Sequence, residues 1–139
     1  IQDSSVTFLN SNGNALVYFS APEGNFYVQT KHRSALETWS STPVSFSTAS
    51  ITPYDFTAAQ SQTYGNNSVL TLGEYCSYSG EILKDGNIDL ADVVLIHNDV
   101  TVFAAGYLPT DVNGDSFVDL TDMLVTSNNS ANFVSVSKP

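Results

Sequence analysis

"DVNGDSFVDLTD", residues 111–122, decides how the C-terminal half of this chain folds. It places an acid or an amide at its first, third, fifth, ninth and twelfth positions, which are Asp111, Asn113, Asp115, Asp119 and Asp122. Carboxylates crowded to roughly 4–6 Å repel one another by on the order of a few kcal/mol per pair at an intermediate dielectric. A folded chain keeps such a cluster when a cation neutralises it, so the stretch indicates a bound positive ion.

The spacing matches the ligand positions of a calcium loop. Calcium takes six to eight oxygen ligands, and a twelve-residue EF-type loop supplies them from positions 1, 3, 5, 7, 9 and 12. Position 7 contributes the Phe117 carbonyl, and Asp119 binds directly or through water. The loop departs from the EF-hand pattern at Ser116, where Gly is expected, and at Asp122, where Glu is expected. We predict one calcium ion here; the alternative is a solvated acidic turn in which Asp119 only caps a helix.

The chain repeats itself at a spacing of 30 residues from about residue 79 onward. Apolar residues recur at helical spacing in "LADVVLIHND" and "LTDMLVTSNN", which predicts a loop followed by a helix of two to three turns in each unit. The segments ahead of the loops, "CSYSG" and "GYLPT", do not favour an entering helix. The matching pairs include Asp85 with Asp115, Asp89 with Asp119, Asp92 with Asp122 and Phe103 with Phe133.

The first loop, residues 81–92, has a poorer set of ligands. Leu83 at position 3 offers no oxygen, and Lys84 adds a positive charge beside the site. The loop therefore either binds a second calcium ion weakly or serves as a structural turn, and the sequence leaves both open. Its candidate ligands are Glu81, Asp85, Asn87, Asp89 and Asp92.

Residues 1–78 alternate short strand patterns with turn signals. "SNGN", residues 11–14, predicts a hairpin turn between strands at 5–10 and 15–20. Further strands are predicted at 26–33, 37–41, 43–48 and 68–76, with a long ordered connection at 50–67. Six or seven short strands favour a small β-sandwich. The predicted fold is thus a mostly β, sandwich-like domain (1–78) followed by a small domain of loops and helices (79–139).

Composition excludes several classes of partner. The net charge is -10 with only four basic residues, which disfavours nucleic acids and anionic membranes. Nine of the fourteen acids lie between Glu81 and Asp122, so the charge belongs to a local feature. No apolar run approaches the ~18 residues of a membrane span.

The single cysteine, Cys76, is expected to be a small buried hydrophobe. A chain that opens at Ile1 is expected to be a processed product or a fragment.

The sequence does not favour an enzyme. No motif places a serine or cysteine beside His32 or His97, and the acids of the strand-rich half show no converging pair. We interpret His32 as a hydrogen-bonded core or surface residue. Trp39 and the seven tyrosines are more typical of a core than of a carbohydrate platform.

The tandem loop–helix units, with the pattern D-x-N-x-D-x-x-x-D-x-x-D, resemble the dockerin type I repeat over residues 80–139. The chain as a whole is similar to the C-terminal regions of large secreted bacterial proteins, where a strand-rich segment precedes a dockerin-like pair. That similarity rests on "KHR" (31–33), "ETWSS" (37–41), "YDFT" (54–57) and "YGNN" (64–67). The resemblance implies a secreted, non-catalytic, calcium-stabilised module that binds a cohesin-like or cell-surface protein.

Two functions follow from these patterns. The first is an interaction or anchoring module of a secreted protein. Cohesin-binding dockerins typically carry polar contact residues just before the last ligand, whereas this chain has Leu90-Ala91 and Leu120-Thr121, which we expect to pack inside. The alternative is a structural subunit that associates with copies of itself into a calcium-stabilised extracellular fibre or sheath, because a lightly charged β-module can pair edge to edge.

Overall fold

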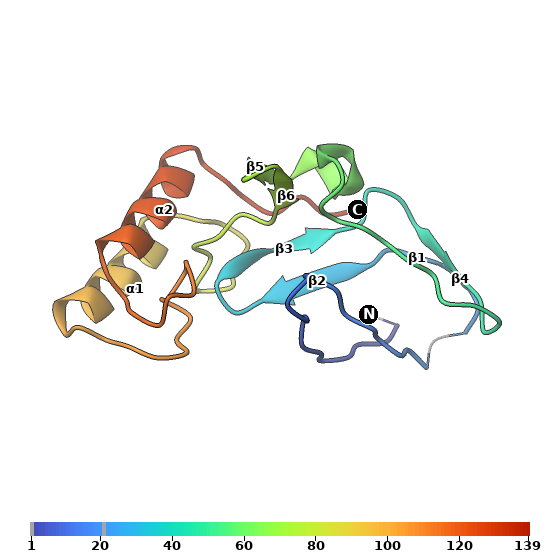
Figure 1. The fold of residues 1–139 in the computed structure, drawn as a ribbon. Coiled ribbons are helices and arrows are strands. Elements are labelled where there is room, and N and C mark those ends of the chain that lie inside the picture. The colour runs from blue at the N-terminus through green and yellow to red at the C-terminus, as the bar shows by residue number, and fades with distance from the viewer. Residues whose placement is uncertain (1, 21) are drawn as a thin grey trace.

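The computed structural model describes residues 2–20 and 22–139, which form a strand-rich part followed by two helices (Figure 1). This confirms the predicted order of strands first and helices second. None of the helices in the described residues is long and apolar enough to cross a bilayer. The elements are β1 (Gly24–Phe26), β2 (Gln29–His32), β3 (Ala35–Trp39), β4 (Val44–Phe46), η1 (Gln60–Gln62), η2 (Tyr64–Asn66), β5 (Val69–Thr71), β6 (Glu74–Cys76), α1 (Leu90–Thr101) and α2 (Leu120–Ala131).

The strands pair as three antiparallel two-stranded sheets, β1 with β4, β2 with β3 and β5 with β6. The stretch 26–33, predicted as one strand, is divided between β1 and β2, which belong to different sheets. The stretch 68–76 is a hairpin, because Leu72 and Gly73 both have positive φ (52° and 95°) and form the turn between β5 and β6. Positive φ at both central residues is what a two-residue hairpin turn of type I′ requires. A sandwich built from these sheets stays a prediction.

The strands predicted at 5–10 and 15–20 are wrong for this chain. Residues 2–20, the N-terminal arm, contain the predicted turn, where Asn10 N–H donates to Asn14 O at 2.9 Å and Gly13 N–H to Asn10 O at 3.0 Å. The two legs on either side of the turn make no backbone ladder with each other or with another described strand. A strand needs a paired neighbour and a covered face, and a lone hairpin is marginal in water.

The prediction that Cys76 is buried is also wrong. Cys76 ends β6 and is exposed, and its Sγ lies 3.8 Å from the carbonyl oxygen of Glu74. The sheet that holds it has only two strands, and all three residues of β5 are exposed as well. Without a covering layer, the alternation of side chains along a strand does not bury either face.

Helices α1 and α2 begin 30 residues apart and each contains 12 residues, which confirms the predicted pair of loop–helix units. The two units exchange backbone bonds. Asn87 in the first loop pairs with Ser135 beyond α2, whereas Phe117 in the second loop pairs with Ala105 beyond α1. A backbone hydrogen bond of 2.9 Å accompanies each bridge. Each loop is therefore held by the segment that follows the other helix, so neither unit is complete alone.

The apolar core is small, and the chain is closely packed where the first loop begins. Its buried apolar residues, within the described ranges, are Ala35, Leu36, Val44, Ile88, Ile96 and Val118. Thr126 of α2 is fully buried, and its hydroxyl is without a hydrogen-bond partner. Gly80 lies against it, because a Cβ built on Gly80 would come within 2.5 Å of the Thr126 hydroxyl oxygen. Close packing of this kind leaves no room for a methyl group.

We expect Gly80→Ala to lower the free energy of unfolding by about 1–3 kcal/mol more than Gly106→Ala does, because of this overpacking. Gly106 is a matched control: its φ is +107° against +106° at Gly80, so both substitutions strain the backbone equally, but no atom lies within 4 Å of a Cβ at Gly106. Urea denaturation of both variants measures the difference. Equal losses would show that Thr126 does not limit the space.

Candidate metal centre

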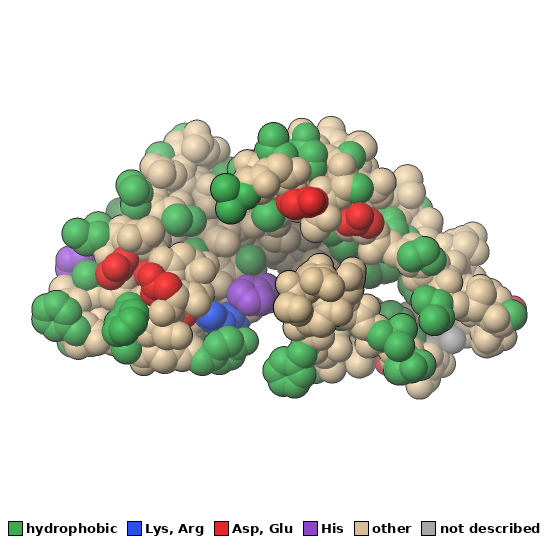
Figure 2. Space-filling model, in the orientation of Figure 1, with side chains coloured by type: hydrophobic (Ala, Val, Ile, Leu, Met, Phe, Trp, Pro, Cys, Tyr) green, Lys and Arg blue, Asp and Glu red, His purple; other side chains and the backbone are tan. Residues whose placement is uncertain are grey.

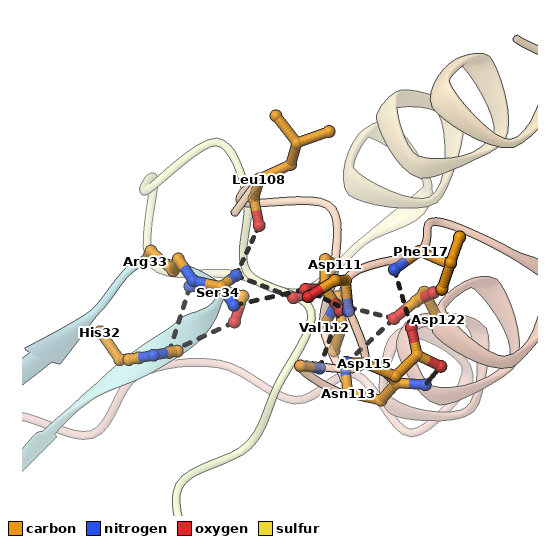
Figure 3. Close-up of polar contacts among 12 residues, drawn as sticks. His32, Arg33, Ser34, Leu108, Asp111, Val112, Asn113, Asp115, Phe117 and Asp122 are labelled. Carbon is orange, nitrogen blue, oxygen red and sulfur yellow. Dashed lines mark hydrogen bonds and ion pairs between the residues drawn. The ribbon is translucent and has the colours of Figure 1, made fainter. Parts of the chain in front are cut away.

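The second loop closes around Asp111 and Asp122 (Figure 3). Asp111 is 2% exposed, and its two carboxylate oxygens accept the N–H groups of Gly114 at 2.8 Å and Ser116 at 3.2 Å. Gly114 and Ser116 both have positive φ, 83° and 73°. Ser116 thus adopts the left-handed conformation that glycine has at position 6 of an EF-type loop. Because serine carries a Cβ, this conformation strains its backbone more than it would strain that of glycine.

Asp122 connects the loop to the helix that leaves it. Its side chain is 0% exposed; one oxygen accepts the N–H groups of Val112 at 2.7 Å and Asn113 at 3.0 Å, and the other accepts that of Asp119 at 3.0 Å. Asp119 in turn caps α2 through a capping box with Asp122. The capping role that the sequence gave as the alternative for Asp119 is therefore present.

The other predicted ligands of the second loop lie at its surface. The Asn113 side chain donates to Asp115 at 3.0 Å, and Asp115 accepts the N–H of Phe117 at 2.8 Å. Asp115 and Asp119 are both exposed. In the ranges that the structure describes, no three acidic, histidine or cysteine side chains are gathered as a metal-holding group. The loop brings positions 1 and 12 inward and leaves positions 5 and 9 outside.

The first loop has the same backbone shape. Its left-handed residues are Lys84 (φ 61°) and Gly86 (φ 96°), at the same positions as in the second loop. Asp92 repeats the role of Asp122: it is 0% exposed and accepts the N–H groups of Ile82 at 2.7 Å, Leu83 at 3.0 Å and Asp89 at 3.0 Å. The two loops therefore differ in their side-chain ligands and not in their fold.

Lys84 holds the first loop closed. Its ammonium donates to the carbonyl oxygens of Glu81 at 2.5 Å and Ala35 at 3.0 Å. Glu81 is only 3% exposed, and its side chain accepts the N–H of Asp85 at 3.1 Å. Burial raises the pKa of Glu81 and lowers the pKa of Lys84, and in both groups the attraction between the two charges opposes the shift.

Arg33, which the sequence analysis did not place at either loop, plays the matching part at the second loop. From the turn between β2 and β3 it donates to the carbonyl oxygens of Leu108 at 2.5 Å and Asp111 at 2.9 Å, and it lies 3.5 Å from the Asp111 carboxylate (Figure 3). Its guanidinium also stacks on Tyr107, 4.1 Å from the ring centre. Arg33 and Asp111 are 78 residues apart in the sequence, so a local sequence pattern cannot predict this contact.

His32 has a serine beside it, contrary to the sequence-based expectation. The hydroxyl of Ser34 lies 3.2 Å from His32 Nδ1. Partial burial, followed by the nearby charges of Arg33 and Lys84, lowers the pKa of His32. The spacing is that of a nucleophile and a base, but Ser34 is 1% exposed, so a substrate cannot reach its hydroxyl in this structure.

The expectation that Leu90 and Leu120 pack inside is wrong. They are 70% and 67% exposed, because Asp92 and Asp122 point inward and turn the first residue of each helix to the surface. Around Leu90 the surface forms a shallow apolar groove that also includes Leu83 and Val94. Apolar side chains therefore stand exposed where each loop meets its helix.

We expect Arg33→Gln to lower the free energy of unfolding by about 2–4 kcal/mol in EDTA, because it leaves the buried Asp111 carboxylate without its positive partner. Lys31→Gln is the control: Lys31 also pairs with a carboxylate, Glu37 at 3.3 Å, but its side chain is 63% exposed, and exposed pairs contribute under about 1 kcal/mol. Urea denaturation at neutral pH measures both. Similar losses in the two variants would contradict the role given to Arg33.

Comparison of the chain with protein-family models, with curated proteins and with solved structures finds no match. The residues and geometry of the two loops must therefore carry the functional assignment.

Proposed function

We propose that the chain is a non-catalytic, calcium-binding interaction module of a secreted protein. One observation carries the proposal: a twelve-residue loop closes with buried carboxylates at positions 1 and 12 and has oxygen-bearing side chains at positions 3, 5 and 9. The donor set of carboxylates, an amide and a carbonyl suits a hard cation such as calcium. The proposed ligands are Asp111, Asn113, Asp115, the Phe117 carbonyl, Asp119 and Asp122.

The proposed ion would neutralise charge that the protein balances only in part. Arg33 offsets Asp111 on the side of the strand-rich part, whereas Asp115 and Asp119 face solvent with no cation within ion-pair distance among the described residues. Because these two carboxylates are exposed, they can turn toward the loop without disturbing the core. Metal binding of this kind stabilises the folded state, since the unfolded chain offers no preformed site.

The first loop is proposed as the weaker site. Glu81, Asp85, Asn87, Asp89 and Asp92 would be its ligands, but position 3 supplies no side-chain oxygen. Lys84 already bonds the carbonyl of Glu81 and places a positive charge beside it. One ion per chain in the second loop is therefore the main expectation, with a second ion at higher calcium concentration.

The resemblance to dockerins supplies the kind of interaction that we propose. The exposed leucines at the start of α1 and α2 would meet a cohesin-like or cell-surface protein, and the strand-rich part, as a sandwich-like domain, would support this surface. Isolated exposed leucines are common on proteins, but the two are placed alike on the repeated units. Such paired positions suit a partner that contacts the helix starts.

A second candidate is a subunit that associates with copies of itself into a calcium-stabilised fibre or sheath. The observation that favours it is the N-terminal arm, whose apolar side chains are exposed and whose two legs make no backbone ladder with a described strand. Unpaired extended segments of this kind are templates for edge-to-edge association.

We expect calcium to raise the melting temperature, and Asp115→Ala to remove most of that rise while it changes the stability in EDTA little. Asp115 is exposed and bonds only within its own turn, so its removal costs the proposed ion a ligand without unpacking the core. Asp85→Ala, 30 residues earlier at the same position of the first loop, is the matched control and should keep most of the rise. Thermal melts with calcium and with EDTA measure the effect.

Isothermal titration completes this test, with an expected loss in calcium affinity of about tenfold or more for Asp115→Ala, because one carboxylate ligand is missing. A melting temperature that calcium does not change would overturn the assignment of the loop. Equal losses from Asp115→Ala and Asp85→Ala would mean that the two loops are ranked wrongly.

A further inference from the structure

The N-terminal arm exposes large apolar side chains, and of these Phe19 also contacts the ring of Phe46 in β4. Val6 is 98%, Phe8 92% and Tyr18 82% exposed, and Leu9, Leu16 and Phe19 are 68%, 53% and 43% exposed. Figure 2 shows apolar side chains projecting along the edge of the molecule where the arm lies in Figure 1. Apart from Asp3, residues 2–20 carry no charge.

The exposed area matches what an interface needs. At about 150–200 Å² for each fully open large side chain, the six apolar residues on the two legs together expose roughly 650–870 Å². Monomeric proteins rarely present more than a few hundred Å² in one apolar patch, and a standard protein interface covers about 800 Å² on each partner. The two legs of the arm together therefore offer close to one partner's share, and either leg alone offers about half of it.

A strand edge of complementary character lies elsewhere on the same chain. β5 pairs only with β6, all its residues are exposed, and it carries no charge. β6 is engaged on its outer side, where Tyr75 N–H donates to Thr57 O at 3.1 Å, so β5 is the open edge of this sheet. Exposed Leu70 and Leu72, at 59% and 102%, add an apolar surface beside that edge.

The edge at β2, by contrast, is protected. β2 carries Lys31 at 63% side-chain exposure and has a register irregularity between Thr30 and His32. A lysine and a bulge are two of the devices by which natural edge strands avoid pairing with other chains, and a very short edge strand is a third. β5 has neither within its three residues, although it is short.

We propose that a leg of the N-terminal arm of one copy adds as a strand to the open edge of β5 in a second copy. This deepens the second candidate function, self-association, and rests on it. The arm and the β5–β6 hairpin lie on opposite edges of the molecule (Figure 1), so the contact joins different copies. Because donor and acceptor are different surfaces, the contact is heterologous, and repetition gives an open chain of subunits unless the rotation closes a ring.

Phe8→Asp in the full chain tests the proposal, with Phe133→Asp as its matched control. The two phenylalanines are 92% and 88% exposed, so both variants remove the same apolar surface and add the same charge, but only Phe8 lies in the arm. Sedimentation velocity over a range of protein concentrations should show oligomers of the unmodified chain, weakened roughly tenfold or more by Phe8→Asp and retained by Phe133→Asp. Electron microscopy of the unmodified chain should show filaments or rings.

A chain that stays monomeric at every concentration, with and without calcium, overturns the proposal, and so do oligomers that both variants weaken equally. Hydrogen exchange locates the acceptor: the amides of β5 should slow on association, and protection confined to other segments overturns the assignment to β5. The thermal response of Phe8→Asp to calcium separates the two functions. If calcium still raises its melting temperature while association is lost, the arm and the metal loop act independently.

Discussion

A fully buried carboxylate must have its charge satisfied, and two such groups organise the C-terminal half. Asp92 and Asp122 are each inaccessible to solvent, and each accepts three backbone N–H groups, two from the loop and one from the residue that caps the helix. These bonds fix the loop to the start of its helix, where the helix dipole also favours a negative group. Loss of either carboxylate would release a loop and a helix N-terminus together.

The strand-rich part is fastened to both loops at one place, the turn between β2 and β3. Arg33 in this turn bonds the carbonyl of Asp111, Lys84 reaches back to the carbonyl of Ala35, and Ser34 O accepts the N–H of Gly80 at 2.6 Å. Arg33 and Lys84, two of the four basic residues of the chain, thus lie beside its most closely spaced acidic residues. In both loops, side-chain cations and backbone N–H groups bond oxygen atoms of the loop, some of which an ion would also take as ligands.

The repeat made the helical half predictable, whereas the strand half depends on contacts that sequence patterns do not contain. A 30-residue period places Asp92 and Asp122 alike, so both helices and their caps could be predicted from the sequence. Alternation of apolar residues at 5–10 and 15–20 indicates a strand but does not say that a neighbour exists in the same chain. Arg33 was missed because its partner lies 78 residues away. Leu90 was misplaced because the buried acid, and not the leucine, faces inward.

Charge is distributed unevenly along this molecule, and its placement bears on how calcium and assembly would be related. The arm and β5 are nearly uncharged, whereas nine of the fourteen acids lie in residues 81–122. Repulsion between exposed charges is screened beyond about 8 Å at physiological salt, so the loops oppose association only where copies bring them close together. An ion in the second loop would lower the charge at that place and leave the uncharged surfaces unchanged. Calcium would then act on assembly through the order and charge of the helical end, while the apolar arm would supply the attraction.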